Sequence, residues 1–279
     1  MTRRSSPVPP PRLPAPLLPA LGLVAALALW WLATAVLAAD DPLAGQITPA
    51  RTLQGARELW GGALLADAAS SVYRLAAGLA VALVLGVALG VATGASAALD
   101  AASRPVLLFL RMVSPLSWAP LAIGVFGIGD PPVVALVAAT ALWPIALATA
   151  DGVRAVDPGH LLVARAFGAG RVEVWRAVTW PTVRPRLLGG IRAAIGIAWV
   201  VLVPAEMLGV TSGLGYAILN AKDQLAYHHI TALIVVIGTL GYAIDVVARW
   251  WLRTPRQRRA EREAHRRVPA PTPAPEPAA

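Results

Sequence analysis

The sequence predicts an all-α membrane protein with six spanning helices and one long loop between the fourth and the fifth. Hydrophobic residues make up 57% of the 279 residues and charged residues only 14%, whereas a soluble domain is about a quarter charged. The apolar residues form blocks of membrane length, and the arginines lie between the blocks. Because almost no polar face remains for water, a soluble helical bundle is excluded.

Six apolar blocks approach the roughly 20 residues that a helix needs to cross the hydrocarbon core. Only short polar connections separate them, so we expect one membrane domain, 17–252. A proline-rich cytosolic N-terminus (1–16), predicted to be disordered, precedes it, and a basic, then Pro/Ala-rich cytosolic tail (253–279) follows. The first block is longer than the roughly 7 to 15 apolar residues of a signal peptide, which favours a retained span. The predicted spans are 13–39, 75–93, 112–129, 131–150, 193–221 and 230–252.

The distribution of arginine predicts the orientation of the spans. Every basic residue except Lys222 is an arginine, and the net charge is +9. Six spans would put both termini, the 93–104 turn and the 151–190 loop on one side, with only Arg51, Arg57 and Lys222 on the other. Basic residues concentrate on the cytosolic side of a bilayer. We therefore expect a multi-pass protein of the plasma (inner) membrane with both termini in the cytosol, in contact with lipid and not with nucleic acid.

Several kinds of chemistry are not expected. The chain has no cysteine, so disulfides and thiol nucleophiles are excluded. A phosphate-binding loop ends in Gly-Lys-Ser or Gly-Lys-Thr, but Lys222 follows Ala221. The adjacent pair His228 and His229 lacks the helical spacing of a metal site. The sequence therefore predicts no enzyme, no metal and no cofactor bound by this chain.

The 151–190 loop carries two predicted helices. Residues 161–167 have a helical pattern, and Gly168-Ala169-Gly170 ends it because glycine tolerates left-handed backbone. A second helical stretch covers 171–179, and Pro181 is expected to stop or kink it. Two short helices joined by a glycine elbow can form a knob that inserts into a groove of a partner protein. They can also lie on the membrane surface.

This loop resembles that of membrane subunits in bacterial ATP-binding-cassette importers. Their pattern is Glu-Ala-Ala, three residues, Gly, nine residues, an apolar residue, one more, Leu, Pro. The positions that match are Ala164, Gly168, Val178 and Pro181. The positions that depart are Leu162 in place of the glutamate, Val163 in place of an alanine and Trp180 in place of the leucine. The missing glutamate leaves any ion pair from that position in question.

The resemblance extends over roughly residues 70–253. Segments 104–105, 114–121, 126–130, 198–199, 205–209 and 212–216 are similar to the nitrate, sulfonate and taurine importer permeases. The resemblance implies that two permease subunits pair as a homodimer and that separate cytosolic ATPases bind their loops and hydrolyse ATP. It also implies that an extracytoplasmic binding protein delivers a small solute. The expected docking face is apolar, from Leu162, Ala164 and Phe167, with Arg165 and Arg171 at its rim.

A few residues inside the spans are candidates for the solute path or its gate. Glu206 would cost on the order of 2.5 to 3.5 kcal/mol at mid-bilayer, and we expect a structural or gating role in preference to solute contact. Arg192, Trp199, Glu206 and Gly213 are spaced seven residues apart, which predicts that they lie along one face of a helix. Trp118 and Trp143 lie near prolines and either line the path or are ordinary core aromatics.

Further patterns predict helix packing and leave other functions open. Asp245 and Arg249 are spaced for an ion pair on one helix, and Gly86, Gly90 and Gly94 favour close helix packing. A gradient-driven secondary transporter or channel is the alternative function, and a membrane scaffold a third. The secondary transporter should carry more intramembrane ionisable groups.

Overall fold

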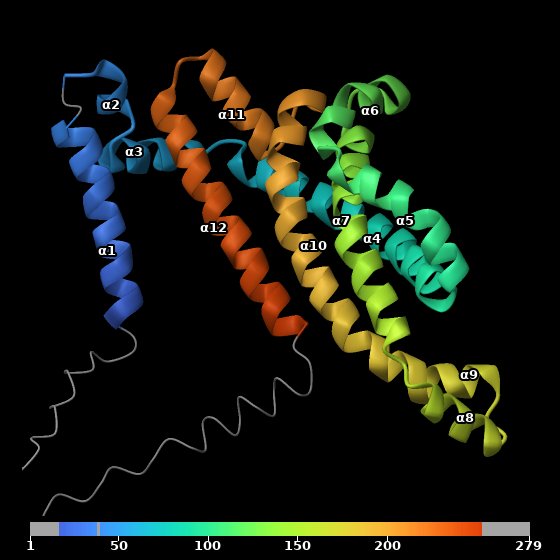
Figure 1. Ribbon diagram of the computed structural model, residues 1–279. Helices are drawn as coiled ribbons and strands as arrows, with labels where there is room; N and C mark the ends of the chain where they lie inside the picture. The colour runs from blue at the N-terminus through green and yellow to red at the C-terminus, as the bar shows by residue number, and fades with distance from the viewer. Residues whose placement is uncertain (1–16, 38–39, 253–279) are drawn as a thin grey trace, which may run out of the picture. The chain divides into compact units, whose positions relative to one another are not determined.

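The computed structural model describes residues 17–37 and 40–252, and within these ranges the secondary structure is helical without a strand. Figure 1 shows long helices joined by short connections. The predicted all-α fold is therefore confirmed. The predictions for 1–16 and 253–279 lie outside the described residues. The chain divides into two compact units, Met1–Leu64 with Asn220–Val235, and Leu65–Leu219 with Val236–Ala279.

The predicted number of six spans is not confirmed in the described part of the chain. Four helical stretches are long and apolar enough to cross a membrane: α4 (Leu64–Ala95), α7 (Asp130–Arg154), the stretch Arg171–Gly209 and α12 (Tyr227–Trp251). The first apolar block forms only a shorter apolar helix, Ala20–Val36, made of α1 (Leu17–Trp31) and a π-helical turn (Leu32–Leu37). Among residues 17–37 and 40–252 the count is thus four, or five if a bent pair of helices is one span.

The bent pair replaces the third predicted span. The helix α5 (Ala97–Met112) is followed by a 3₁₀ turn (Pro115–Trp118) and α6 (Ala119–Phe126), and the two parts meet at 89°. Val113 and Ser114 both have a ψ of 128°, which is extended backbone. A proline disfavours the helical conformation of the residue before it, so Pro115 explains the break.

Glycine brings α4 and α7 together in the second unit. A Cβ atom at Gly90 would lie 2.4 Å from the Ala146 carbonyl oxygen, and one at Gly94 would lie 2.8 Å from the Val153 Cβ. Small residues allow backbones to approach closely. The predicted role of the glycine ladder is confirmed.

The helices α7 and α10 (Trp180–Gly209) pack against each other and form much of the core. A Cβ at Gly190 would lie 2.5 Å from the Ala148 Cβ, and one at Gly152 would lie 2.9 Å from the Val183 Cα. The side chains buried in this core include Val137, Ala141, Ile145, Ala194, Ala198 and Leu202.

The fifth span, predicted as 193–221, has different ends in the structure, and of the two effects expected of Pro181, a stop or a kink, the stop does not occur. Pro181 does not stop the helix, which continues from Arg171 to Gly209. A π-helical turn at Trp175–Thr179 directly precedes the proline, and such turns accommodate local changes in backbone hydrogen bonding. The helix also ends before 213, because Val210 is extended and Gly213 has a φ of +99°. Gly213 is therefore not part of the helical stripe that contains Glu206.

The first unit contains α1, α2 (Pro42–Gln46), α3 (Pro49–Trp60), the end of α11 (Leu214–Asp223) and the start of α12. The Trp30 indole donates to the Ile47 carbonyl at 3.0 Å. Thr52 of α3 donates to Thr231 of α12 at 2.9 Å. These bonds hold the short helices of this unit together.

Candidate functional site

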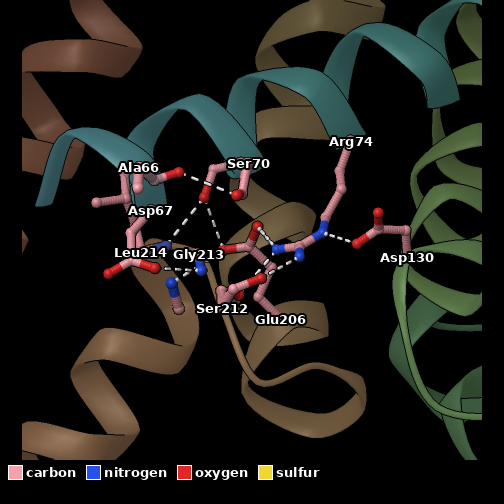
Figure 2. Close-up of polar contacts among 11 residues, drawn as sticks. Ala66, Asp67, Ser70, Arg74, Asp130, Glu206, Ser212, Gly213 and Leu214 are labelled. Carbon is pink, nitrogen blue, oxygen red and sulfur yellow. Dashed lines mark hydrogen bonds and ion pairs between the residues drawn. The ribbon is translucent and has the colours of Figure 1, made fainter. Parts of the chain in front are cut away.

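A buried ion pair joins two membrane helices of the second unit. Arg74 lies on α4, and its Nη1 is 2.8 Å from Oε1 of Glu206 on α10. The two side chains are 3% and 0% exposed. Figure 2 shows the guanidinium and the carboxylate pointing toward each other between the helices. Because a lone buried charge is costly, each residue supplies the partner that the other needs.

The Arg74 guanidinium also contacts two further segments. Its Nε donates to Oδ1 of Asp130, the first residue of α7, at 2.8 Å. Its Nη1 donates to the Ser212 carbonyl at 2.8 Å, and its Nη2 donates to the Ser212 Oγ at 2.6 Å (Figure 2). One side chain therefore links α4, α7, α10 and the connection that follows α10. We call Arg74, Asp130, Glu206 and Ser212 the Arg74 clamp.

The second oxygen of Glu206 is also occupied. Its Oε2 accepts from the Ser71 hydroxyl and from the Gly215 backbone N–H, both at 2.9 Å. Ser71 in turn accepts from Leu214 N at 2.9 Å, and Asp67 accepts from Gly213 N at 2.8 Å. Since both carboxylate oxygens are bound within the protein, the geometry favours the expected structural or gating role of Glu206 over contact with a solute.

Gly213 permits the connection to pass close to the clamp. Its positive φ of +99° is a conformation that other residues rarely adopt. A Cβ there would lie 2.5 Å from Arg74 Nη1 and 2.6 Å from Glu206 Oε1. The glycine that the sequence placed on a helical stripe is instead required by the turn over the ion pair.

The predicted loop forms a protruding helix–glycine–helix knob between α7 and α10 (Figure 1). The helix α8 (Pro158–Ala166) begins at Asp157, whose side chain accepts from Gly159 N at 2.7 Å. Gly168 has a φ of +78°, as the predicted elbow requires. The helix α9 (Arg171–Val174) starts after Gly170, whose N–H donates to Glu173 at 2.9 Å. The knob is thus ordered by its own hydrogen bonds.

Most of the predicted docking residues are on the surface of the knob. Phe167 is 88% exposed and Leu162 67% exposed, which is unusual for large apolar side chains unless they meet lipid or a partner. The remaining predicted positions divide into exposed Arg165, Arg171, Gly168 and Pro181, and half-buried Ala164 and Val178.

Two cavities lie beside α5, α7 and α10. One has a volume of about 200 Å³ and is lined by residues including Arg104, Arg111, Trp143 and Arg154. The other has a volume of about 380 Å³, and Arg111 and Trp143 line it as well. Arg104 and Arg154 are ion-paired with Asp100, whereas Arg111 forms no ion pair with any residue in the described part of the chain.

The three tryptophans proposed for the path occupy different environments. Trp143 lines both cavities, and Trp118 and Trp199 line neither. Trp199 is half-buried and packs so closely on Gly241 of α12 that a Cβ there would lie 2.4 Å from its Nε1. The geometry favours a packing role for Trp199 and keeps Trp143 as a candidate lining residue.

Sequence reasoning assigned no role to Arg74. The second predicted span, 75–93, begins directly after it, so the sequence does not place Arg74 in the membrane. The signal was nevertheless present, because Glu206 lay within an apolar block and a buried carboxylate requires a cationic partner. Asp130 and Ser212 belong to segments that carried the family resemblance, but nothing in their spacing indicated one shared partner.

The described helices, the clamp and the knob define a multi-pass helical membrane component. Residues 82–259 match the family described as "Binding-protein-dependent transport system inner membrane component". The match covers more than half of the chain, and the protein belongs to this family. The expectation that the chain is not itself an enzyme is confirmed by this membership.

Individual relatives support the same assignment. The chain is 34% identical over 227 residues to the putative aliphatic sulfonates transport permease protein SsuC of Escherichia coli, covering 80% of this chain and 83% of that protein. It is 30% identical over 183 residues to the bicarbonate transport system permease protein CmpB of Synechococcus elongatus, covering 65% of this chain and 66% of that protein. The chain thus spans slightly less than two thirds of the length of CmpB.

A solved structure shares the fold. The crystal structure of an amino acid ABC transporter with histidines contains a chain that matches with a TM-score of 0.53 at 16% identity. The match covers 72% of this chain and 95% of that one. The permease fold of this class of transporter is therefore present here.

Proposed function

We propose that this chain is the permease subunit of an ATP-binding-cassette importer, which forms the membrane path for a small solute. A separate cytosolic ATPase supplies the energy, and an extracytoplasmic binding protein delivers the solute. The observation that carries the proposal is the knob of α8, Gly168 and α9, which exposes Phe167 at the position of the family's coupling loop. This chain binds no ATP itself, because it lacks a phosphate-binding loop.

The knob suits docking to a protein. Its exposed apolar side chains, Leu162 and Phe167, lie at and just before the elbow, with Arg165 and Arg171 exposed beside them. An apolar centre with an arginine rim is typical of a protein–protein contact. Leu162 occupies the position of the glutamate in the family pattern, so apolar contacts take the place of an ion pair from that position.

The two helices that flank the knob connect it to the Arg74 clamp. The knob joins the end of α7 to the start of α10, and the clamp holds the opposite ends of the same helices through Asp130 and Glu206. The 25 residues of α7 span about 37 Å at 1.5 Å per residue. A displacement of the knob by the ATPase therefore moves two tightly packed helices whose far ends share one arginine. In this mechanism the clamp keeps the extracytoplasmic end closed until that displacement occurs.

The proposed solute is a small oxyanion. The names of the relatives include bicarbonate, aliphatic sulfonates and nitrate, and in this chain Arg111 and Trp143 line both cavities. A guanidinium without an internal ion pair attracts anions. Which oxyanion is carried depends on the binding protein that delivers it.

The proposal includes an assembly and an orientation. Two copies of the chain pair around the path, each bound by an ATPase at its knob. The knob and both termini face the cytosol, as the arginine distribution predicts. The lipid bilayer surrounds the apolar helices.

The test is copurification of the coexpressed ATPase with the permease, followed by solute uptake in proteoliposomes. We expect Phe167→Ala to reduce the bound ATPase about 30-fold, the equivalent of a 2 kcal/mol interface hot spot, because the side chain makes little contact within its own chain. Gly168→Asp should also weaken binding, since it strains the elbow, where φ is +78°, and places a carboxylate beside the apolar docking face. The control is His160→Ala, which truncates another exposed residue of α8.

Two results would contradict the proposal. One is ATPase binding and uptake at wild-type levels in both knob variants. The other is ATP hydrolysis by the purified chain alone.

A further inference from the structure

A cluster of two histidines and a glutamate lies in the first unit. His228 and His229 are the second and third residues of α12, and Glu58 is near the end of α3. The Nε2 atom of His228 is 3.3 Å from Oε2 of Glu58, and that of His229 is 2.9 Å from the same oxygen. The proposed function uses none of these residues. The sequence alone predicts no metal at the adjacent histidines, because their spacing does not show that Glu58 of another helix lies beside them.

We propose that Glu58, His228 and His229 bind one divalent transition-metal ion, with Zn²⁺ as the best match. Two imidazoles and one carboxylate are a donor set that zinc uses in proteins, with further positions left for water. Bonds of about 2.0 to 2.1 Å in tetrahedral geometry separate neighbouring donor atoms by about 3.3 Å. The three donor atoms here all lie within 4.8 Å of one another, so small side-chain movements are enough to enclose an ion.

The carboxylate is held in place by neighbouring side chains. Gln54 donates to Oε1 of Glu58 at 2.9 Å, and Arg51 donates to the Gln54 amide oxygen at 3.0 Å. Oε2 is therefore the oxygen that faces the imidazoles. Partners of this kind orient metal ligands and tune affinity.

The two helices that supply the ligands are also held close together. A Cβ at Gly55 would lie 2.6 Å from the His228 carbonyl oxygen, so only glycine permits this approach of α3 to α12. Thr52 is buried and bonds to Thr231 one turn further along. The ligands thus come from two elements whose backbones are already in contact, which lowers the entropy cost of assembling the site.

Solvent can reach the cluster. The side chains of Glu58, His228 and His229 are 43%, 28% and 23% exposed. Metal binding replaces the two Nε2 contacts to the carboxylate with nitrogen–metal bonds. The proton that each Nε2 donates to Glu58 is released to solvent or moves to Nδ1 of the same ring. A bound ion would then link α3 to the start of α12.

The experiment measures zinc binding to the full chain, purified in detergent through a histidine-free tag and stripped with a chelator. Titration calorimetry should give one Zn²⁺ per chain. His229→Ala and Glu58→Gln should each weaken binding at least about 100-fold, and Gln54→Ala about 10- to 100-fold, the range for an orienting partner. The matched control, His160→Ala, removes a histidine from α8 and should leave the affinity unchanged.

A second measurement does not depend on how the variants fold. Co²⁺ added to the wild-type chain should give visible absorption bands of a protein-coordinated ion, and Zn²⁺ should abolish them and raise the melting temperature. The proposal is overturned if the wild-type chain shows neither saturable zinc binding nor the cobalt spectrum. Zinc affinity in folded His229→Ala and Glu58→Gln equal to that of the wild type would also overturn it.

Discussion

At the scale of single residues, substitutions in the Arg74 clamp are expected to change the stability of the protein most. The free-energy cost of removing two charges from water is offset only if their hydrogen-bonding groups all find partners. Both oxygens of Glu206 have such partners here. Removing one member leaves the other buried without its partner, which costs about 3 to 5 kcal/mol in proteins. The same interaction that holds the helices together is therefore sensitive to single substitutions.

Glu206→Gln should lower the melting temperature of the detergent-solubilised chain strongly, because Arg74 loses its buried carboxylate partner and keeps only the half-exposed Asp130. The double variant Arg74→Met, Glu206→Met should regain much of the stability, since apolar replacement of a buried pair is often neutral. A clamp that is part of the gate also predicts that this stable double variant does not support ATP-dependent solute uptake.

A surface ion pair is the control for this experiment. Asp245 and Arg249 form the predicted ion pair on α12, and their side chains are 46% and 55% exposed. Asp245→Asn should change stability by about 1 kcal/mol or less. Equal melting temperatures for Glu206→Gln and Asp245→Asn would contradict the role given to the clamp.

Gly213→Ala should destabilise the protein even though it adds only one carbon. The positive φ and the 2.5 Å approach to Arg74 Nη1 both oppose a side chain at this position. Gly196→Ala on α10 is the matched control, because nothing lies within 4 Å of its Cβ position. Alanine in a helix interior is about 0.5 to 1 kcal/mol more favourable than glycine. Thermal unfolding that ranks the two variants the other way would refute the account of the turn.

At the scale of helices, close approach of α4 to α7 depends on the absence of side chains. The ladder Gly86, Gly90, Gly94 leaves room for the backbone of α7, with the contacts at Gly90 being the tightest of the three. The glycine spacing alone predicted this, because residues four apart lie on one helix face. The partner helix could not be predicted, since the spacing describes only one of the two surfaces.

Gly90→Ala should weaken the α4–α7 contact, because its Cβ would lie 2.4 Å from the Ala146 carbonyl oxygen and 2.6 Å from the Thr149 Cβ. Neither atom can move without shifting α7. Gly238→Ala on α12 is the control, with nothing within 4 Å. We expect a lower melting temperature only for Gly90→Ala, and identical values would show that the ladder tolerates a methyl group.

The ends of helices were predicted less well than their existence. The elbow at Gly168 was predicted because a positive φ is a local demand that glycine alone meets easily. The continuation through Pro181 was not, because a π-helical turn can compensate for a proline in ways that composition does not reveal. The break after Met112 was also not predicted. Pro115 interrupts the helix there, but the residues around it are apolar, so the stretch looks like one continuous span.

At the scale of the whole molecule, composition and the placement of arginine predicted a membrane protein. The Arg74 clamp could not be predicted in this way, because it forms only in the folded structure. Each hydrophobic block of about 20 residues indicates a membrane protein by itself, because many residues contribute to the same signal. The clamp depends on Arg74 and Glu206, 132 positions apart, and no local pattern connects such positions. The predicted domain boundaries 1–16 and 253–279 stay predictions.

Reporter fusions can test the orientation. A green fluorescent protein at the C-terminus should fluoresce and an alkaline phosphatase there should be inactive, because basic residues concentrate on the cytosolic side of a bilayer. Phosphatase fused in the connection after α3, at Gly61, should be active. Fusions within the knob, at Ala169, should behave like the C-terminus. The reverse pattern would invert the topology and place the knob out of reach of a cytosolic ATPase.

The separation of Arg74 and Glu206 along the chain has a consequence for biosynthesis. The ribosome adds about 5 to 20 residues per second, so the 132 residues between them take roughly 7 to 26 s to synthesise. Throughout that interval, α4 carries an arginine whose buried partner, Glu206, does not yet exist, although Asp130 is synthesised earlier. The nascent amino-terminal half therefore completes its assembly only when α10 arrives, and quality-control proteases have that interval in which to recognise an unfinished chain.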